Sequence, residues 1–279
     1  MGLRDITEQH HYPGWLLRNP RWIFIHYLLL RLFFIRSRVC RKALAQLIER
    51  DAIVRVLDAG CGEGQYTIPF ARQYPEKYFT GIDVLHDHID FLNTLKQELN
   101  LDHCTFLQND IESHLGTHPG YHLIIIIGVL QYLKNPEAVI EQAFLHQSYG
   151  GYLFIYTPVD EGLEFGFYKY FRRRYGHYDD AREYYHPIQR DALLSWVAQS
   201  GYSLIEKQEH YGMAGSLGHQ IMQSILMMAS HGHPVTKALS LLIFILFMPI
   251  FVPLQWADTW IGTSKRSRSN GLLLILQKL

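Results

Sequence analysis

Short apolar runs alternate with stretches of helical periodicity through the middle of the chain. The apolar runs are rich in β-branched and aromatic residues and are bounded by turn residues, which is typical of buried strands. Seven such strands are expected, at residues 53–58, 78–83, 105–109, 121–127, 151–156, 202–208 and 272–277. Helical patterns lie near residues 65–73, 88–98, 136–146 and 189–199. The alternation predicts an α/β fold with a doubly wound, mostly parallel seven-stranded sheet that helices cover on both faces.

Both ends of the chain carry a more apolar pattern than this core. Near the N-terminus, an aromatic run at 22–35 has basic residues on both sides, namely Arg18, Arg21, Arg36, Arg38 and Arg41. Near the C-terminus, residues 238–254 contain no charged residue and stand between the last two strands. We therefore expect an N-terminal helical segment over 1–50, an α/β core over 51–210, a helical insert over 211–270, and a final core strand over 271–279.

The charge balance and the cysteine content limit the classes of protein. The 26 Lys and Arg residues balance the 26 Asp and Glu residues, which argues against a protein whose main partner is nucleic acid. The three cysteines are scattered, and no cysteine or histidine spacing is typical of a metal site. We expect no bound metal, no disulfide framework and a location in the cytoplasm.

Candidate binding residues follow the ends of the first three strands. They are glycines and acids: Asp58, Gly60, Gly62, Gly64, Asp83 and Asp110. Glycines allow positive φ and let a ligand approach the backbone, and the carboxyl ends of the strands are where open α/β sheets bind ligands. A carboxylate at Asp83 can accept both hydroxyls of a ribose, and Asp110 can accept an adenine amino group. Together they predict a nucleoside-containing cofactor, although each acid taken singly also fits a helix N-cap.

The sequence Asp-Ala-Gly-Cys-Gly-Glu-Gly at 58–64 resembles that of class I S-adenosylmethionine-dependent methyltransferases. Its G-x-G-x-G spacing differs from the G-x-G-x-x-G of dinucleotide-binding proteins. The resemblance covers about residues 51–208 and the final strand, and it implies a Rossmann-like enzyme with the cofactor S-adenosyl-L-methionine. In that family the glycine turn approaches the methionine portion, the acid at Asp83 binds the ribose, and Asp110 with the backbone of Ile111 meets the adenine. The turn that begins at Gly128 would line the methyl-transfer site.

The catalytic base does not follow from the resemblance. Family members often carry an acid just before the fourth strand and Glu-His in the following turn, whereas this chain has His122 and Gln131-Tyr132. An oxygen acceptor usually needs a base, and His186 is our candidate, with Tyr132 and Tyr185 shaping the site. The alternative is that His186 caps or packs. The Asn/Asp-Pro-Pro-Tyr motif associated with nucleobase or glutamine methylation is absent, so nucleic acid is not expected as the substrate.

The apolar insert is almost long enough to span a bilayer, but pairing of the last two strands would return both its flanks to one side. A single span is therefore excluded. A second pass over 213–230 is too polar, and Pro249 and Pro253 would break a straight helix. An in-plane or re-entrant helix and a lid over the sheet remain. The arginine-flanked run at 22–35 fits either an interfacial helix on anionic lipid or a helix over the cofactor cleft.

These observations predict a methyltransferase for a small, hydrophobic or lipid-linked acceptor, with O-methylation favoured. We expect peripheral contact with the inner face of a membrane through 22–35 and 238–257. Two other functions stay open: a nicotinamide-dependent Rossmann oxidoreductase, and a non-catalytic, membrane-associated protein with a methyltransferase fold. The glycine spacing argues against the first, and the intact glycines and acids argue against the second. The basic run at 171–175 is interpreted as a solvated charge run.

Overall fold

The computed structural model describes residues 19–160, 162–175, 188–231, 234–260 and 269–279. One seven-stranded sheet runs through it in the order β3-β2-β1-β4-β5-β7-β6. Its strands are β1 (Arg55–Ala59), β2 (Tyr78–Asp83), β3 (Cys104–Gln108), β4 (Tyr121–Ile127), β5 (Gln147–Pro158), β6 (Ser203–His210) and β7 (Gly271–Gln277). Only β7 among these strands runs antiparallel to its neighbours, β5 and β6. The expected doubly wound α/β fold is confirmed.

The strand positions follow the apolar runs closely. β2 and β4 have the predicted bounds, and three of the four successive isoleucines in β4, Ile124 to Ile126, are buried between parallel strands β1 and β5. β5 begins earlier than predicted because Gln147 pairs with Tyr121 across an irregular register before the regular pairing starts at Leu123 and Tyr152. Local apolar alternation does not report such an irregularity.

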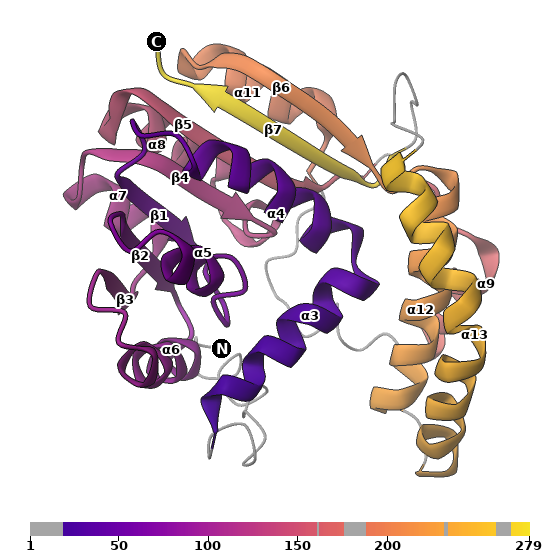
Figure 1. Cartoon of the computed structure of the whole chain (residues 1–279). Coiled ribbons are helices and arrows are strands. Elements are labelled where there is room, and N and C mark those ends of the chain that lie inside the picture. Colours follow the sequence, from indigo (N-terminus) through magenta and orange to yellow (C-terminus); the bar gives the residue numbers. More distant parts are fainter. Residues whose placement is uncertain (1–18, 161, 176–187, 232–233, 261–268) are drawn as a thin grey trace.

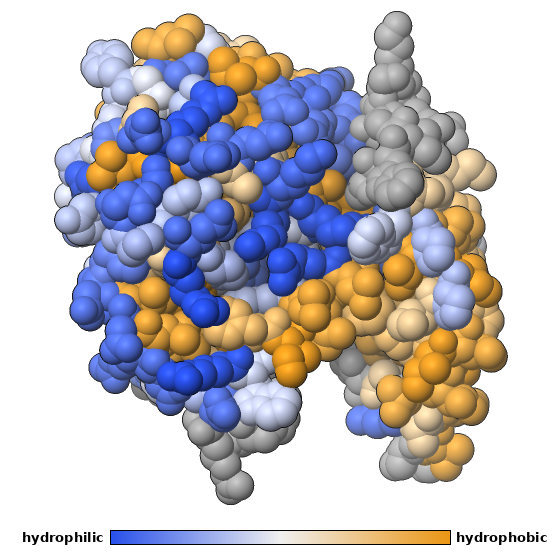
Figure 2. Space-filling model, in the orientation of Figure 1, coloured by the Kyte–Doolittle hydropathy of each residue, from blue (hydrophilic) through white to orange (hydrophobic). Residues whose placement is uncertain are grey.

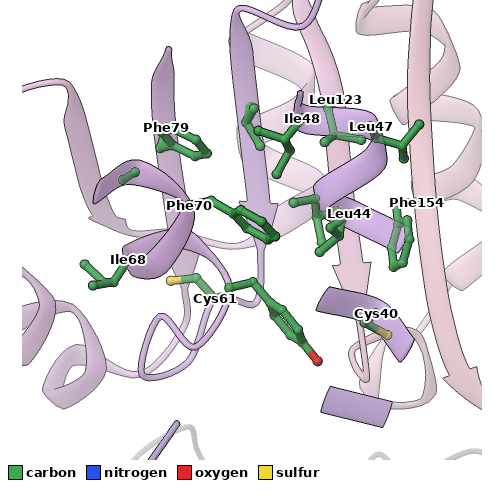
Figure 3. Close-up of a cluster of buried hydrophobic side chains, with 14 of the residues drawn as sticks. Cys40, Leu44, Leu47, Ile48, Cys61, Ile68, Phe70, Phe79, Leu123 and Phe154 are labelled. Carbon is green, nitrogen blue, oxygen red and sulfur yellow. The ribbon is translucent and has the colours of Figure 1, made fainter. Parts of the chain in front are cut away.

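Helices cover both faces of the sheet. One face carries α4 (Ile35–Ile48), α5 (Thr67–Gln73) and α6 (His86–Leu99), and the other carries α7 (Ile111–Thr117), α8 (Pro136–His146) and α11 (Arg190–Ser200). α4 shows how the sequence specifies this packing, because Cys40, Leu44, Leu47 and Ile48 recur at helical spacing and are all buried. Figure 3 shows Leu44 and Leu47 on the same side of the sheet as Phe154 of β5.

Two helices precede this core along the chain. The 3₁₀ helix η1 (Pro20–Trp22) leads into α3 (Ile23–Phe33), which ends at Phe34, where the backbone is extended. Arg38 of α4 donates to the Arg31 and Leu32 carbonyl oxygens at this break. It also donates to the Gln255 carbonyl and stacks over Trp256. Arg38 therefore joins the N-terminal segment to the insert.

The insert forms two long helices, α12 (Met213–His231) and α13 (Pro234–Trp260), preceded along the chain by α9 (Gly166–Tyr175). Figure 1 shows α12 and α13 side by side, beyond the sheet edge where β6 and β7 lie, with α9 next to α12. α13 continues through Pro249 and Pro253, so the expected break is wrong. Each proline removes one backbone donor, and the remaining i to i−4 bonds suffice to continue the helix.

The polar residues of 213–230 do not prevent that segment from being a long helix, because the protein itself satisfies them. Gln220 donates to the Leu163 carbonyl and accepts from the Phe165 amide. The Ser216 and Ser224 hydroxyls donate to the carbonyl oxygens of Tyr211 and Gln220. The polar face of α12 is thus buried against neighbouring protein.

Candidate active site

The glycine turn after β1 lies at the carboxyl edge of the sheet. Gly60 has φ +77°, and a Cβ there would lie 2.2 Å from Val129 Cγ2, so only glycine fits between the turn and the residue after Gly128. Gly62 has φ +52° and no atom within 4 Å of a Cβ position, which leaves its backbone open. Gly64 also has positive φ and packs against α6 through Leu92. The turn therefore offers the close backbone approach that its sequence predicts.

Asp83 ends β2 and faces this turn. Its Oδ2 accepts from the Gly62 amide at 2.9 Å, and its Oδ1 accepts from the Leu85 amide at 2.9 Å. His88 Nδ1 lies 3.5 Å from Oδ2. Although burial alone would raise the pKa of Asp83, hydrogen bonds from His88, Leu85 and Gly62 hold it below its usual value. The group stays ionised, and a carboxylate keeps lone pairs for further donors such as ribose hydroxyls.

Asp110 follows β3 and caps α7. Its Oδ1 accepts from the amides of Glu112 and Ser113 at 2.9 and 3.2 Å, so the alternative of an N-cap is confirmed. The residue is nevertheless exposed, and both of these bonds use Oδ1. Capping of α7 leaves Oδ2 of Asp110 available, so acceptance of a hydrogen bond from the adenine amino group stays a prediction. Ile111 is buried as the first residue of α7.

The turn after β4 is fixed by a chain of polar contacts. Gly128 has φ +70°, and its amide donates to the Tyr156 carbonyl at 2.8 Å. Gln131 Nε2 donates to the Gly128 carbonyl at 2.9 Å, and the Thr157 hydroxyl donates to Gln131 Oε1 at 3.4 Å. Gln131, which departs from the family pattern, therefore holds the turn in place between β4 and β5.

Asp58 at the end of β1 is almost fully buried. Its Oδ2 accepts from the Thr67 hydroxyl at 2.5 Å, which joins β1 to α5. Burial raises the pKa of Asp58 to about 6 despite the hydrogen bond from Thr67, and the nearby charge of Asp83 raises it further. Asp58 therefore holds the end of β1 against α5 through Thr67, and in this way it supports the glycine turn.

In the natural protein, the free energy of unfolding is expected to fall as the pH rises from about 4 to about 6, because Asp58 then loses its proton. In an Asp58→Asn variant this fall should be absent. The folded-state pKa of about 6 lies above the ordinary aspartate pKa of 3.8, so folding binds a proton in that window. The free energy of unfolding falls there by about 3 kcal/mol, and it is constant above the folded pKa. Urea unfolding of both proteins across this range measures the difference. Parallel pH profiles would contradict the assignment.

The candidate catalytic residues are placed only in part. His186 and Tyr185 lie outside the described residues, so their role stays a prediction. Tyr132 is half-buried in the 3₁₀ helix η2 (Leu130–Tyr132), directly after Gly128 and Val129. His122 lies near the start of β4, where its Nδ1 accepts from the Arg55 amide at 3.0 Å. It is therefore at the opposite end of the strand from the turn and outside the site.

One residue that the sequence did not single out reaches the turn from α3. The Tyr27 hydroxyl donates to the Glu63 carbonyl inside the glycine turn. α3 therefore covers the turn on the side of α6, as the alternative of a helix over the cleft predicts. The signal available in the sequence was a lone tyrosine in an aromatic run, which local patterning cannot distinguish from core.

The arrangement fits an adenosyl cofactor. The backbone at Gly62 is open, an ionised acid lies at the next strand end, and an exposed acid stands after the third strand. Within the described part of the chain, no group of three His, Cys, Asp or Glu residues could hold a metal ion.

Comparisons with known proteins agree with this geometry. Residues 51–225 match a family model described as a methyltransferase domain. Malonyl-[acyl-carrier protein] O-methyltransferase of Bacillus cereus is 29% identical over 126 residues, 44% of this chain and 45% of that protein. Ubiquinone biosynthesis O-methyltransferase of Shewanella pealeana is 29% identical over 104 residues, 37% of this chain and 43% of that protein. The alignments thus span less than half of either relative.

A solved structure is similar over most of the chain. Coclaurine N-methyltransferase bound to N-methylheliamine and SAH superposes with a TM-score of 0.56 at 15% identity. The match covers 86% of this chain and 72% of that one, and it supports the fold.

Proposed function

Because the chain belongs to the methyltransferase-domain family that its residues 51–225 match, we propose that it methylates an oxygen of a small, apolar or lipid-linked acceptor at a membrane surface. The protein is a class I S-adenosylmethionine-dependent methyltransferase. When bound, the cofactor supplies an electrophilic methyl group on its sulfonium. The chain then has to hold the cofactor, align the acceptor oxygen with that methyl group and accept a proton from it.

The observation that carries the proposal is the exposed apolar face of α13. Residues Val235–Asp258 have a mean hydropathy of 2.3, and 11% of the apolar window is buried. Leu241, Leu242, Ile245 and Leu246 are each 59–69% exposed. Figure 2 shows a mostly hydrophobic surface over α13, whereas hydrophilic and hydrophobic residues alternate over the core. A patch of this kind is typical of a membrane or protein contact, and a lid buried against the sheet would not show it.

The position of the insert connects this apolar face to the site. α12 and α13 follow β6 and precede β7, and Gly271 pairs with Pro158 at the carboxyl end of β5. An acceptor held by the hairpin would therefore enter near the turn after β4. α3 adds Ile25, Leu28 and Leu29, which are exposed to 43–57%. These data support membrane contact through 22–35 and 238–257.

Charge on α9 favours an anionic membrane surface. Arg172, Arg173 and Arg174 are exposed on this helix, which packs against α12. Glu164 pairs with Arg172 at 2.7 Å, which leaves a net basic surface beside the apolar hairpin. Basic residues next to an apolar helix stabilise attachment to anionic lipid. Since the pairing of β6 with β7 keeps both ends of the insert on one side, we propose peripheral attachment to the inner face of the cytoplasmic membrane.

Two of the relatives support an oxygen acceptor. They are named O-methyltransferases, one for malonyl-[acyl-carrier protein] and one for ubiquinone biosynthesis. The zero net charge of the chain supports a small acceptor over nucleic acid.

Incubation with methyl-labelled S-adenosylmethionine and fractionated cell extracts tests the proposal. We expect label to enter the organic-soluble lipid fraction with the natural protein, and not with an Asp83→Ala variant. Mass spectrometry of the labelled product should place the methyl group on oxygen. Label confined to the aqueous or nucleic-acid fraction, or a methyl group on nitrogen or carbon, would contradict the proposed acceptor.

A further inference from the structure

An arginine without a counter-ion lies beside the turn after β4. A Cβ at Gly128 would lie 2.9 Å from Arg36 Nη1, so the guanidinium stands directly against this turn. Within the described residues, the Arg36 guanidinium makes no ion pair. The backbone amide of Arg36 donates a hydrogen bond to the Tyr211 hydroxyl at 3.4 Å. Arg36 is half-buried, and a cation this deep without a carboxylate is costly unless a ligand pairs with it.

Four polar side chains from other parts of the chain surround Arg36. We name them, with Arg36, the arginine–tyrosine cluster: Arg36, Tyr66, Tyr156, Tyr211 and His219. The Tyr156 hydroxyl and Nδ1 of His219 are buried and have no hydrogen-bond partner among the described residues, whereas the buried Tyr66 hydroxyl is hydrogen-bonded to Cys40. The ring centroids of Tyr211 and His219 are 4.8 Å apart. Unsatisfied buried donors beside an unpaired cation indicate a missing acceptor group.

The protonation states of the cluster favour an anion. Although burial alone would lower the pKa of Arg36, the neighbouring tyrosine hydroxyls raise it above its usual value. Burial raises the pKa of Tyr66 and Tyr156 well above the usual value, so both stay protonated donors. Burial, together with the charge of Arg36, lowers the pKa of His219 to about 4, so this ring is neutral at pH 7. The cluster thus carries one positive charge and hydroxyl donors around it.

Most of the cluster lies on the acceptor half of the sheet edge, while Tyr66 follows the glycine turn, two residues after Gly64. Tyr156 is in β5, Tyr211 follows β6, and a Cβ at Gly271, the first residue of β7, would meet the Tyr156 hydroxyl. The ribose-binding candidate Asp83 and the glycine turn lie on the β1–β2 half. On its other side the cluster borders the end of α3, where the rings of Phe34 and His219 have centroids 6.0 Å apart. The neighbouring Phe33 in turn contacts Phe244 and Phe251 of the insert.

We infer that the arginine–tyrosine cluster binds the acidic head group, a carboxylate or a phosphate, of an amphiphilic acceptor whose apolar part extends toward α12 and α13. The inference rests on the proposed function, because it names the chemical class of the acceptor that this site takes. A guanidinium with two tyrosine hydroxyls can donate to several anionic oxygens at once, and such charge-assisted bonds are strong in a buried site. The head group then fixes the acceptor beside Gly128.

The test compares decanoate with decanol, which share a chain and differ in charge. Both are titrated into the full-length protein saturated with S-adenosylhomocysteine. We expect decanoate to bind about 10- to 100-fold more tightly than decanol. Arg36→Met should abolish this preference and leave the affinity for S-adenosylhomocysteine within about threefold. Arg36→Lys should keep part of the preference for decanoate, because lysine carries the positive charge but lacks the planar guanidinium that binds two oxygens at once. Decyl phosphate in the same assay distinguishes a phosphate from a carboxylate preference, and either one supports the inference.

The matched control is Arg41→Met, one turn further along α4, where the guanidinium lies 5.1 Å from the Phe70 ring. It should keep the preference for decanoate. If Arg36→Met does not fold, Tyr156→Phe tests the same site, with an expected loss of about 3- to 10-fold in decanoate affinity.

Two results would overturn the inference. One is equal binding of decanoate and decanol by the natural protein. The other is an Arg36→Met variant that keeps the decanoate preference but loses S-adenosylhomocysteine, which would show that Arg36 holds the cofactor's own carboxylate. Failure of the proposed function would look different, since the natural protein would then put no label into lipid.

Discussion

Replacing Asp83 with alanine is expected to lower the affinity for S-adenosylhomocysteine by about 100-fold, which corresponds to about 3 kcal/mol. The carboxylate is ionised, lies at the end of β2, and orients the turn by accepting from the Gly62 amide. Alanine removes the carboxylate oxygens proposed to accept from the ribose hydroxyls. It also removes the hydrogen bond from the Gly62 amide that holds the glycine turn in place. Isothermal titration calorimetry with ligand-free protein measures the affinity.

The control for this change is Asp90→Asn on the same stretch of chain. Asp90 is exposed and pairs with His86 on the surface of α6 at 3.0 Å, so its loss should leave cofactor affinity unchanged. Circular dichroism of both variants checks that the fold persists. An Asp83→Ala protein that binds S-adenosylhomocysteine within threefold of the natural protein would place the ribose elsewhere.

The core of the fold could be predicted from the sequence because its information is local. The run of isoleucines in β4 gives a buried strand, and glycines at positions 60, 62 and 64 give a turn with positive φ. The acid at Asp83 then follows from its place at a strand end. Each of these signals needs at most a few neighbouring residues and one rule of sheet geometry.

The rest of the site depends on contacts between distant segments. Arg36, Tyr66, Tyr156, Tyr211 and His219 come from five separate parts of the chain, and no spacing rule connects them. The arginines of the N-terminal segment looked equivalent in sequence, yet Arg38 bonds carbonyl oxygens at the end of α3 while Arg36 faces the turn at Gly128. The break at Phe34 separates these roles, and an apolar pattern that continues through it gives no sign of the break.

The insert shows a different limit. Its polar residues indicated that 213–230 could not be a long apolar partner of α13, but they are satisfied by the backbone of 163–165 and of α12 itself. The composition of a segment shows how polar its side chains are, but it does not show which groups of the protein will hydrogen-bond to them. Because the polar side chains of α12 bond to neighbouring protein, α12 is the inner helix of the pair and α13 the outer one. The apolar face of α13 is therefore left for a partner outside the chain.

The double change Leu242→Glu and Leu246→Glu is expected to abolish binding to vesicles that contain anionic lipid. The two side chains are 64% and 69% exposed and lie one turn apart on the same face of α13. Transfer of each leucine out of water is worth about 1.5–3 kcal/mol, so losing both lowers membrane partitioning by at least about 100-fold. Buried carboxylates would weaken it further. Co-sedimentation with liposomes measures the bound fraction, and cofactor affinity should not change.

The matched control places two glutamates on an exposed apolar site of the core, at Leu145 and Tyr149, which are 64% and 84% exposed. These positions lie at the end of α8 and in β5. Figure 1 shows α8 on the opposite side of the molecule from α13. The control adds the same charge, so general repulsion from anionic lipid affects both proteins equally. A control that loses binding as fully as the α13 variant would show that charge alone is responsible. An α13 variant that still co-sediments would show that the protein binds the vesicles through another surface, and it would contradict the prediction.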